Sequence, residues 1–390
     1  MNLLITIFFI QALSILLGFM KIISQKLMIN SLRFSYAAFL LFSGFVKILD
    51  PLGFSYKLQE YFEVFGMEWL FPFTVLLSVL ICALEIFIGI FLALGTFIRQ
   101  TLYVNLVLMI GFTFLTFYSA YFNVVTDCGC FGDFMKLDPW FSFQKDIILV
   151  IVSVVLFFYQ SKITFLLKQK DLKLILASSL CLVLFIPIYG LSHLPLIDFR
   201  AYKIGSNIVD GKTLPLEAKK DVFQDIWFYE INGQITEFNT SEEPWNIEGA
   251  VFKDRETKLI KKGDEPLIKD FDIIDSFNDI DMTDSILSMD YVLLVVSYDI
   301  NTTNAAAHSK INNVLLSSNI PTYGLSSSSS YDVEAKLFTT TLPYPYFLVD
   351  QTTLKTMVRS NPGVVLLHNG TVIDKWHWRD VPKKLSSLIN

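Results

Sequence analysis

Residues 127–133 read Asp-Cys-Gly-Cys-Phe-Gly-Asp, and this loop holds two of the four cysteines in the 390-residue chain. Cys128 and Cys130 are separated only by Gly129, so a disulfide between them would close a small, strained ring. Strained, exposed disulfides exchange with thiols more readily than structural ones. Gly129 supplies the backbone freedom that such a ring requires. The spacing therefore favours thiol–disulfide chemistry, with a structural disulfide or two inert thiols as the alternative.

Metal binding is the competing chemistry for a pair of thiols. A closed tetrahedral zinc site needs four ligands, whereas the loop offers two thiols and no histidine. We therefore expect no metal site here. The flanking carboxylates of Asp127 and Asp133 are expected to raise the thiol pKa values. Both are also candidates for contacting a substrate or partner.

The elements that must position this loop are apolar runs. The chain is 53% hydrophobic, and the excess lies in its first half. A membrane span needs about 20 apolar residues. We expect six spans, with the Cys loop between the fourth and fifth: 2–19, 34–50, 72–98, 101–121, 146–160 and 174–196. Residues 1–19 are either an additional N-terminal helix or an over-extended gene start.

The distribution of basic residues predicts the orientation. Lys21, Lys26 and Arg33 precede the second span, and a cluster of lysines at 162–173 follows the fifth. Basic loops stay in the cytoplasm, so the Cys loop and residues 198–390 are predicted to be periplasmic, beside the inner membrane, where disulfides persist. From Ala201 onward there are 18 Lys/Arg and 26 Asp/Glu. This acidic balance argues against nucleic acid as a partner.

Two charged residues fall within or beside the predicted spans. Glu85 lies about half-way along the third, where a carboxyl costs several kcal/mol unless it is neutral or partnered. We interpret it as a proton acceptor or quinone ligand, or as a protonated acid bonded to a neighbouring helix, with no obvious basic partner at its depth. Lys47 lies one turn from the end of the second span. It either contacts a substrate or quinone headgroup or reaches outward as an interface anchor.

Three segments together carry a family resemblance. Phe42-Ser43-Gly44-Phe45-Val46-Lys47 with Asp50-Pro51-Leu52-Gly53, then Leu84-Glu85, then the Cys loop, resemble the DoxX/MauE-type redox-associated membrane proteins. The resemblance covers about residues 20–162 and implies a four-helix membrane core, here the second to fifth spans. The sixth apolar run predicts an additional transmembrane helix within 163–197. It also implies a role in thiol–disulfide traffic or in maturing an extracytoplasmic protein. MauE members are tied to methylamine dehydrogenase maturation, and DoxX members to quinone-coupled sulfur oxidation.

The exported half is predicted to hold a β-hairpin segment, 198–265, and an α/β domain, 266–390. Asn232-Gly233 suits a tight turn between strands 226–230 and 234–238. Within 266–390, the order of strands and helices resembles a thioredoxin fold, with Pro362 at that family's cis-proline position. No cysteine follows Cys181, so this domain lacks dithiol chemistry of its own. We interpret it as a substrate- or partner-docking domain. The alternative is an ordinary α/β domain with a coincidental element order.

Two smaller features of this domain complete the prediction. The serine run 326–330 is expected to be a flexible loop, and a last helix is expected to begin near Asp380. The expected fold is thus an α-helical membrane bundle followed by an α/β thioredoxin-like domain.

The leading functional hypothesis is a membrane thiol–disulfide oxidoreductase. Cys128 and Cys130 would exchange with an extracytoplasmic thiol protein, and a membrane quinone would accept the electrons, with Glu85 as proton acceptor. Lys47, Asp127, Asp133 and Pro362 are the candidate substrate or partner contacts. The sequence contains no cofactor motif, and lipid is the expected surrounding of the spans. The alternative hypothesis is a non-enzymatic membrane scaffold or assembly factor whose exported domain only binds.

Overall fold

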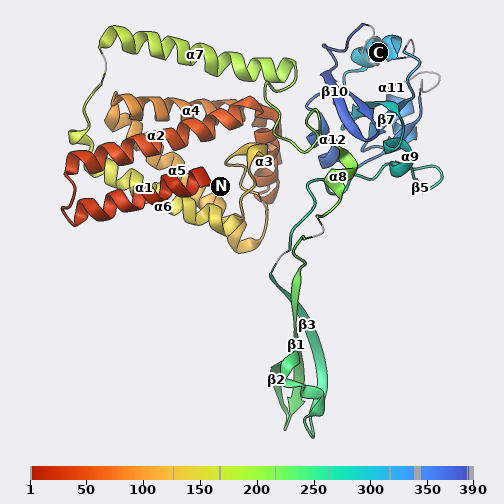
Figure 1. Cartoon of the computed structure of the whole chain (residues 1–390), viewed down its shortest axis with the longest axis horizontal. Coiled ribbons are helices and arrows are strands. Elements are labelled where there is room, and N and C mark those ends of the chain that lie inside the picture. Colours follow the sequence, from red (N-terminus) through yellow and green to blue (C-terminus); the bar gives the residue numbers. More distant parts are fainter. Residues whose placement is uncertain are drawn as a thin grey trace.

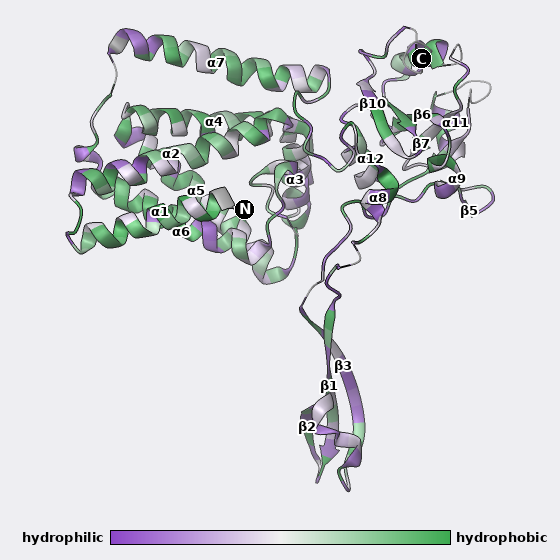
Figure 2. Cartoon of the chain, viewed as in Figure 1, coloured by the Kyte–Doolittle hydropathy of each residue, from purple (hydrophilic) through white to green (hydrophobic). Residues whose placement is uncertain are grey.

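The N-terminal half of the computed structural model is a bundle of apolar helices lying side by side (Figures 1 and 2). The structure describes residues 2–125, 127–166, 168–215, 217–261, 263–315, 318–337, 344–383 and 385. The helices are α1 (Asn2–Phe19), α2 (Gln25–Leu49), α3 (Pro51–Val64), α4 (Thr74–Leu94), α5 (Ile98–Phe122), α6 (Pro139–Phe158) and α7 (Gln169–Ser192), with short 3₁₀ turns η1 (Glu68–Phe73), η2 (Gly132–Phe134) and η3 (Gln160–Lys162).

Five helical stretches of the described residues are long and apolar enough to cross a membrane: 25–49, 68–94, 98–122, 139–158 and 170–192. The protein is therefore a multi-pass membrane protein. The sequence predicted six spans, but the first apolar helix, 4–19, is shorter than this criterion requires. It nevertheless packs on α2, where Ser14 and Ser31 share a 2.7 Å hydrogen bond.

Aspartate caps set the helix starts nearest the Cys loop. Asp50 ends α2 and begins α3, where its side chain accepts a hydrogen bond from Gly53 N at 3.0 Å. Asp138 caps α6 in the same way, with Pro139 at the first helical position. Helix α6 therefore starts seven residues before the predicted span at 146. This earlier start brings Lys145 into the helix instead of leaving it in the loop.

Polar side chains inside the bundle are paired across helices. Asn105 on α5 donates to Tyr36 OH at 3.0 Å and to Ser153 Oγ at 2.8 Å. At the other end of α4 from the Cys loop, the buried Arg33 donates to Leu92 O and Ala93 O, each at 2.7 Å. Those are carbonyls of the last turn, which lack helical partners. Hydrogen bonds of this kind hold helices together where lipid gives no hydrophobic driving force.

The C-terminal half is a mixed α/β domain whose central sheet is covered on both faces (Figure 1). The strand order is β10-β9-β6-β7-β8-β4-β5, in which β6, β7 and β8 are parallel neighbours and the other pairs are antiparallel. The strands are β4 (Ile274–Asp275), β5 (Ile280–Asp281), β6 (Tyr291–Ser297), β7 (Thr322–Ser326), β8 (Tyr346–Leu348), β9 (Gly363–His368) and β10 (Thr371–His377). The helices are α8 (Ile208–Lys212), α9 (Thr283–Leu287), α10 (Ala305–Leu315), α11 (Ser330–Leu337) and α12 (Gln351–Met357).

Two predictions for this domain need correction. The serine run is not a loose loop, because Ser326 ends β7 and Ser330 begins α11. The hydroxyls of Ser326 and Ser327 donate to Ser297 O and Tyr298 O at 3.0 and 2.8 Å, which ties the run to the end of β6. The helix expected from Asp380 is absent over 380–383, and the remainder of that segment falls largely outside the described residues.

A three-stranded arm projects sideways from the junction of the two halves (Figure 1). It has the order β2-β1-β3, from β1 (Val222–Ile231), β2 (Gln234–Asn239) and β3 (Val251–Lys261). The predicted hairpin is confirmed, with Asn232 and Gly233 at positive φ in its turn. Short 3₁₀ turns at 240–242 and 244–246 bring Trp245 within 5.6 Å of the Trp227 ring.

Arg33 gives a test of the bundle. Arg33→Met should lower the free energy of unfolding by about 3 kcal/mol, because charged hydrogen bonds to buried carbonyls are lost. Arg33→Lys should restore only part of this, since an ammonium cannot reproduce the planar fork of donors. Thermal unfolding in detergent measures the change, with Arg99→Met, at an exposed position of α5, as the matched control. Equal melting temperatures for the Arg33→Met and Arg99→Met variants would contradict this role.

Candidate functional site

The Cys loop lies between α5 and α6 as a tight, largely buried turn. Gly129 has a φ of +67°, and a Cβ there would lie 3.0 Å from Lys57 Cγ on α3. Glycine is therefore required both by the backbone angle and by the close approach of α3. Cys128 is 8% exposed and Cys130 is half-buried, and both are free thiols. The Cys130 N–H donates to Cys128 Sγ at 3.4 Å.

Aromatic packing fixes the loop on the bundle. Phe131 is fully buried, with its ring 5.7 Å from Phe39 and 5.9 Å from Phe42, both on α2. Phe134 packs edge-on against Phe42 at 5.4 Å. The loop thus packs against both α2 and α3. These contacts with the helices fix the positions of its two sulfurs.

A buried ion pair on α6 lies directly beside the thiols. Lys145 Nζ is 3.5 Å from Cys130 Sγ and forms a salt bridge with Asp146. Asp146 also accepts a hydrogen bond from Thr116 Oγ1 on α5 at 3.0 Å. Lys145 and Asp146 are 3% and 1% exposed. A positive charge at this distance favours a thiolate.

The two thiols have unequal acidities. The hydrogen bond from Cys130 and the charge of Lys145 outweigh the effect of burial and lower the pKa of Cys128 to about 7. The pKa of Cys130 lies well above its usual range, because its thiol donates that hydrogen bond and is buried. Of the two thiols, Cys128 is therefore the one that ionises first. The expected rise in thiol pKa is found at Cys130 but not at Cys128, where the hydrogen bond from Cys130 and the charge of Lys145 outweigh burial.

A second buried pair contacts the loop from the other side. Lys47 on α2 forms a salt bridge with Glu85 on α4, and each is 2% exposed. Ser43, one turn before Lys47, lies 3.1 Å from Glu85 Oε2 and 3.0 Å from the Cys130 carbonyl oxygen. Lys47 is therefore neither an interface anchor nor free to reach outward, and Glu85 has the basic partner that the sequence did not predict. Ser43 connects this pair to the backbone of the Cys loop.

The two flanking aspartates have different surroundings. Asp127 is 9% exposed and accepts the Gly129 N–H at 3.2 Å. Burial raises its pKa, against the opposing charges of Lys57 and Lys136. Asp133 points to the exported domain, where its Oδ2 accepts a 2.7 Å hydrogen bond from Arg359 Nη2. Only Asp127 therefore stays with the thiol pair.

Arg359 clamps the exported domain onto the bundle. Its Nε donates to Asp50 Oδ2 at 2.8 Å, while Nη2 binds Asp133, and the guanidinium lies 5.3 Å from the centre of the Tyr56 ring. Arg359 is 4% exposed. Although burial favours the neutral acid, Arg359, Arg200 and the Gly53 N–H outweigh it and lower the pKa of Asp50. One side chain thus ties the α2–α3 junction and the Cys loop to the domain.

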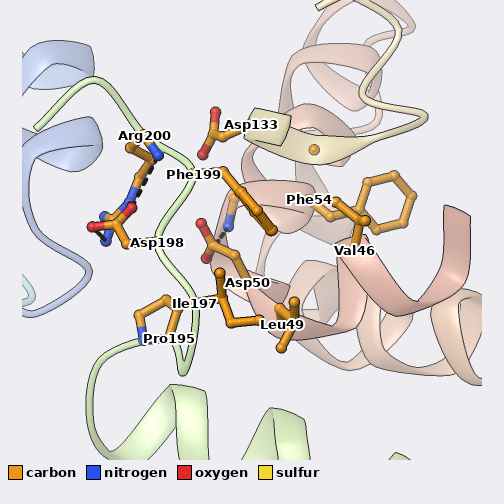
Figure 3. Close-up of a pocket in the computed structure, with 12 residues that line it drawn as sticks. Val46, Leu49, Asp50, Phe54, Asp133, Pro195, Ile197, Asp198, Phe199 and Arg200 are labelled. Atoms are coloured by element: carbon orange, nitrogen blue, oxygen red, sulfur yellow. Dashed lines mark hydrogen bonds and ion pairs between the residues drawn. The ribbon is translucent and has the colours of Figure 1, made fainter. Parts of the chain in front are cut away.

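The segment that links α7 to the exported domain lies against the same clamp. Figure 3 shows Phe199 between Asp50 and Asp133, with Asp198 and Arg200 turned away from the bundle. The Phe199 ring packs on Phe134 at 5.0 Å. Asp198 forms salt bridges with Arg200 and with Lys375 on β10, and these cations outweigh burial to lower the pKa of Asp198 to about 2.

The edge of the domain that holds Pro362 faces the bundle. Pro362 follows a cis peptide bond and lies three residues after Arg359. Asn361 Nδ2 donates to Asp299 O at 2.7 Å, and the adjacent Tyr298 OH lies 3.4 Å from Tyr56 OH on α3. The loop before β9 and the segment after β6 therefore meet at the surface docked on α3. The sequence named this edge as a partner-binding surface, and in the structure the chain's own bundle contacts it.

Four residues of the site were missed from the sequence as participants in its chemistry. Lys145 and Asp146 had a usable signal, because Asp138-Pro139 is a helix start that places both about two turns inside α6. Ser43 was quoted only as part of the resemblance. Arg359 had no local signal, since its partners lie more than 200 residues earlier in the chain.

The surroundings of the site bear on whether a metal ion or a larger apolar group could bind there. No group of three or more metal-ligating side chains occurs in the described part of the chain. An apolar groove of about 400 Å³ lies between α2, α4 and α7, and its residue Phe42 also packs on Phe131 of the Cys loop. The residues that line this groove are Leu41, Phe42, Phe45, Ile48, Ile86, Ile90, Ser179, Leu182, Val183 and Ile186.

The fold and site define a multi-pass membrane protein with a thiol pair held at one end of its helices, followed by an α/β domain. Residues 20–159 match the family model for methylamine utilisation protein MauE, so this membrane segment is similar to that family. The predicted resemblance is thereby confirmed for the bundle. Neither a curated protein nor a solved structure matches the chain.

The clamp predicts a release experiment. Arg359→Met should detach the exported domain, because it leaves Asp50 and Asp133 without their common partner. Amide hydrogen exchange in residues 51–57 and 131–135 should then become tenfold or more faster, as measured by mass spectrometry. Lys310→Met, at an exposed position of α10, is the matched control. Unchanged exchange at both segments in a folded Arg359→Met variant would show that other contacts hold the domain.

The clamp should also depend on pH in one direction. The pKa of Asp50 is depressed in the folded protein, so its stabilising contribution is present above its unfolded pKa of about 3.9. The contribution is lost as the pH falls through the lower, folded pKa. Protection of residues 51–57 should hold at pH 5 and decline below about pH 4. A decline between pH 5 and 7 would point to another group.

Proposed function

We propose that the protein is a membrane thiol–disulfide oxidoreductase in which Cys128 and Cys130 exchange with a dithiol protein outside the cytoplasm. The observation that carries this proposal is the placement of Lys145 Nζ 3.5 Å from Cys130 Sγ. A structural disulfide gains nothing from a buried cation beside its sulfur. A pair that opens to a thiolate does, because the new charge is stabilised where it forms.

The exchange follows from the unequal environments of the two sulfurs. A thiolate of the partner attacks Cys130 Sγ, on the less buried of the two residues, and the Cys128–Cys130 bond breaks. Cys128 leaves as a thiolate, and its lowered pKa makes it the better leaving group. A second partner thiolate then attacks the partner's own sulfur in the mixed disulfide and releases Cys130. Two electrons pass to the Cys pair, and the partner keeps a disulfide.

Reoxidation of the pair needs a two-electron acceptor, for which we propose a membrane quinone. When bound, such a group would supply the capacity for two electrons and two protons per pair. The apolar groove would hold its tail, and Ser43, Glu85 and Lys47 lie between that groove's helices and the Cys loop. In this proposal Glu85 takes up a proton and Lys47 keeps the carboxylate from being buried unpaired.

The exported domain is proposed to be a thioredoxin-like binding module on the periplasmic side. Two observations support this. In the strand order β10-β9-β6-β7, β6 and β7 are parallel, whereas β9 is antiparallel to both β6 and β10, as in the C-terminal part of that fold. The domain also docks at the end of the bundle that carries the Cys loop, through Arg359 and Asp133, so both lie on one side of the membrane.

A scaffold or assembly factor remains the second candidate, and one observation favours it. The edge containing Pro362 is docked on α3 instead of being open to a partner, and no cysteine follows Cys181 in the chain. In that case the Cys pair would be structural, and methylamine-related maturation would depend on binding alone.

Single cysteine variants test the exchange. Cys128→Ser keeps the accessible Cys130 and should accumulate mixed disulfides in cells, several-fold more than Cys130→Ser, whose remaining thiol is buried. Trapping of thiols with a mass-shifting alkylating reagent followed by electrophoresis measures both. Cys181→Ser, on the exposed face of α7, is the control.

The wild-type pair should occur as a mixture of oxidised and reduced forms that shifts with respiratory state. A pair that is wholly oxidised or wholly reduced, together with no mixed disulfide in either variant, would eliminate the oxidoreductase. If the membrane levels of the double variant, Cys128→Ser with Cys130→Ser, also fell, the Cys pair would have a structural role. The scaffold hypothesis would then be retained.

A further inference from the structure

Lys145 is the one charged residue in the described part of the chain that donates a hydrogen bond to a sulfur of the Cys pair. We propose that Lys145 is a positioning residue that holds the negative charge released when the Cys128–Cys130 disulfide opens, and that Asp146 and Thr116 fix it in place. This inference rests on the proposed exchange, and it assigns the exchange an electrostatic device that lies inside the membrane bundle.

The geometry separates Lys145 from the other charges around the loop. On α3, Lys57 packs against Gly129 but its ammonium is paired with Glu60 at 2.9 Å. Lys136 is exposed, and Lys47 is committed to Glu85. The remaining titratable groups that face the pair are acids and a phenol, which disfavour a thiolate: Tyr61, Asp127 and Asp146.

The neighbours of Lys145 keep its ammonium protonated and hold it beside Cys130 Sγ. An isolated lysine buried in an apolar bundle would lose its proton, whereas a partnered one keeps it. Asp146 provides that partner, and the 3.0 Å hydrogen bond from Thr116 Oγ1 restrains the carboxylate. The ammonium also lies 5.7 Å from the centre of the Phe39 ring, a favourable position for a cation. The ammonium is therefore held in place before the disulfide opens.

The same contacts explain why the charge is needed there. Opening the disulfide places a thiolate at residues that are buried or half-buried, where water cannot solvate it fully. A fixed ammonium 3.5 Å from Cys130 Sγ, whose charge also lowers the pKa of Cys128, replaces that water without having to reorganise. Lys145 touches a reacting sulfur but exchanges no bond with the partner, and its proton stays on nitrogen throughout.

The test is the pH dependence of alkylation of the reduced, full-length protein in detergent, followed by mass spectrometry of the peptide that contains both cysteines. In the wild type, the rate should rise with an apparent pKa near 7. In Lys145→Met the apparent pKa should be higher, although the hydrogen bond from Cys130 still lowers it, so that the rate at pH 7 falls several-fold. Lys145→Arg should restore the low value, and Lys136→Met should not change it.

A second variant keeps the test valid if Lys145→Met fails to fold. Lys145→Met with Asp146→Asn removes the pair together and leaves no buried charge unpaired. It should show the same upward shift. A wild-type alkylation profile in either folded variant would overturn the proposal. The outcome is independent of the proposed exchange, because a thiol pair that does not cycle in cells would still show the shift in the purified protein.

Discussion

The structure depends on one constraint, which is that charge inside an apolar bundle must be paired. Lys47 with Glu85 and Lys145 with Asp146 are each nearly inaccessible to solvent. Removing two such charges from water costs several kcal/mol per ion, which is recovered only with close geometry and additional hydrogen bonds. Ser43 and Thr116 supply those bonds. Both ion pairs lie beside the Cys loop. The charges whose burial costs most free energy are therefore next to the two thiols.

The exported domain is subject to the same constraint at the surface of the bundle. Arg359 brings a buried positive charge to Asp50 and Asp133, two carboxylates on separate segments. Asp50 already caps α3, so the clamp uses a residue that the helix start fixes. The domain is thereby connected to the Cys loop only three residues from Cys130. A change in the loop's conformation would be felt at this contact before it reached any other part of the domain.

Much of this arrangement was predictable from local signals, and the rest was not. Hydropathy located the spans, and the Asp-Cys-Gly-Cys-Phe-Gly-Asp string located the reactive pair and the family. The Asn232-Gly233 hairpin followed from turn chemistry. The partners of Glu85 and Asp133 were beyond reach, because a single sequence does not show which helix faces which. Lys145 was missed for a different reason. It was counted as a loop charge because the helix start at Asp138-Pro139 was overlooked, so the lowered pKa of Cys128 was not predicted.

The charge inventory of the site changes with its redox state. The disulfide is neutral, while the reduced pair gains a negative charge when Cys128 ionises. With the disulfide closed, the charge of Lys145 is neutralised by Asp146 alone, and this ion pair has no net charge. With it open, the same ammonium faces two anions, one on each side. Ser43 has a single hydroxyl proton to share between Glu85 and the Cys130 carbonyl. One hydroxyl therefore connects the backbone of the Cys loop to a carboxylate buried in the bundle.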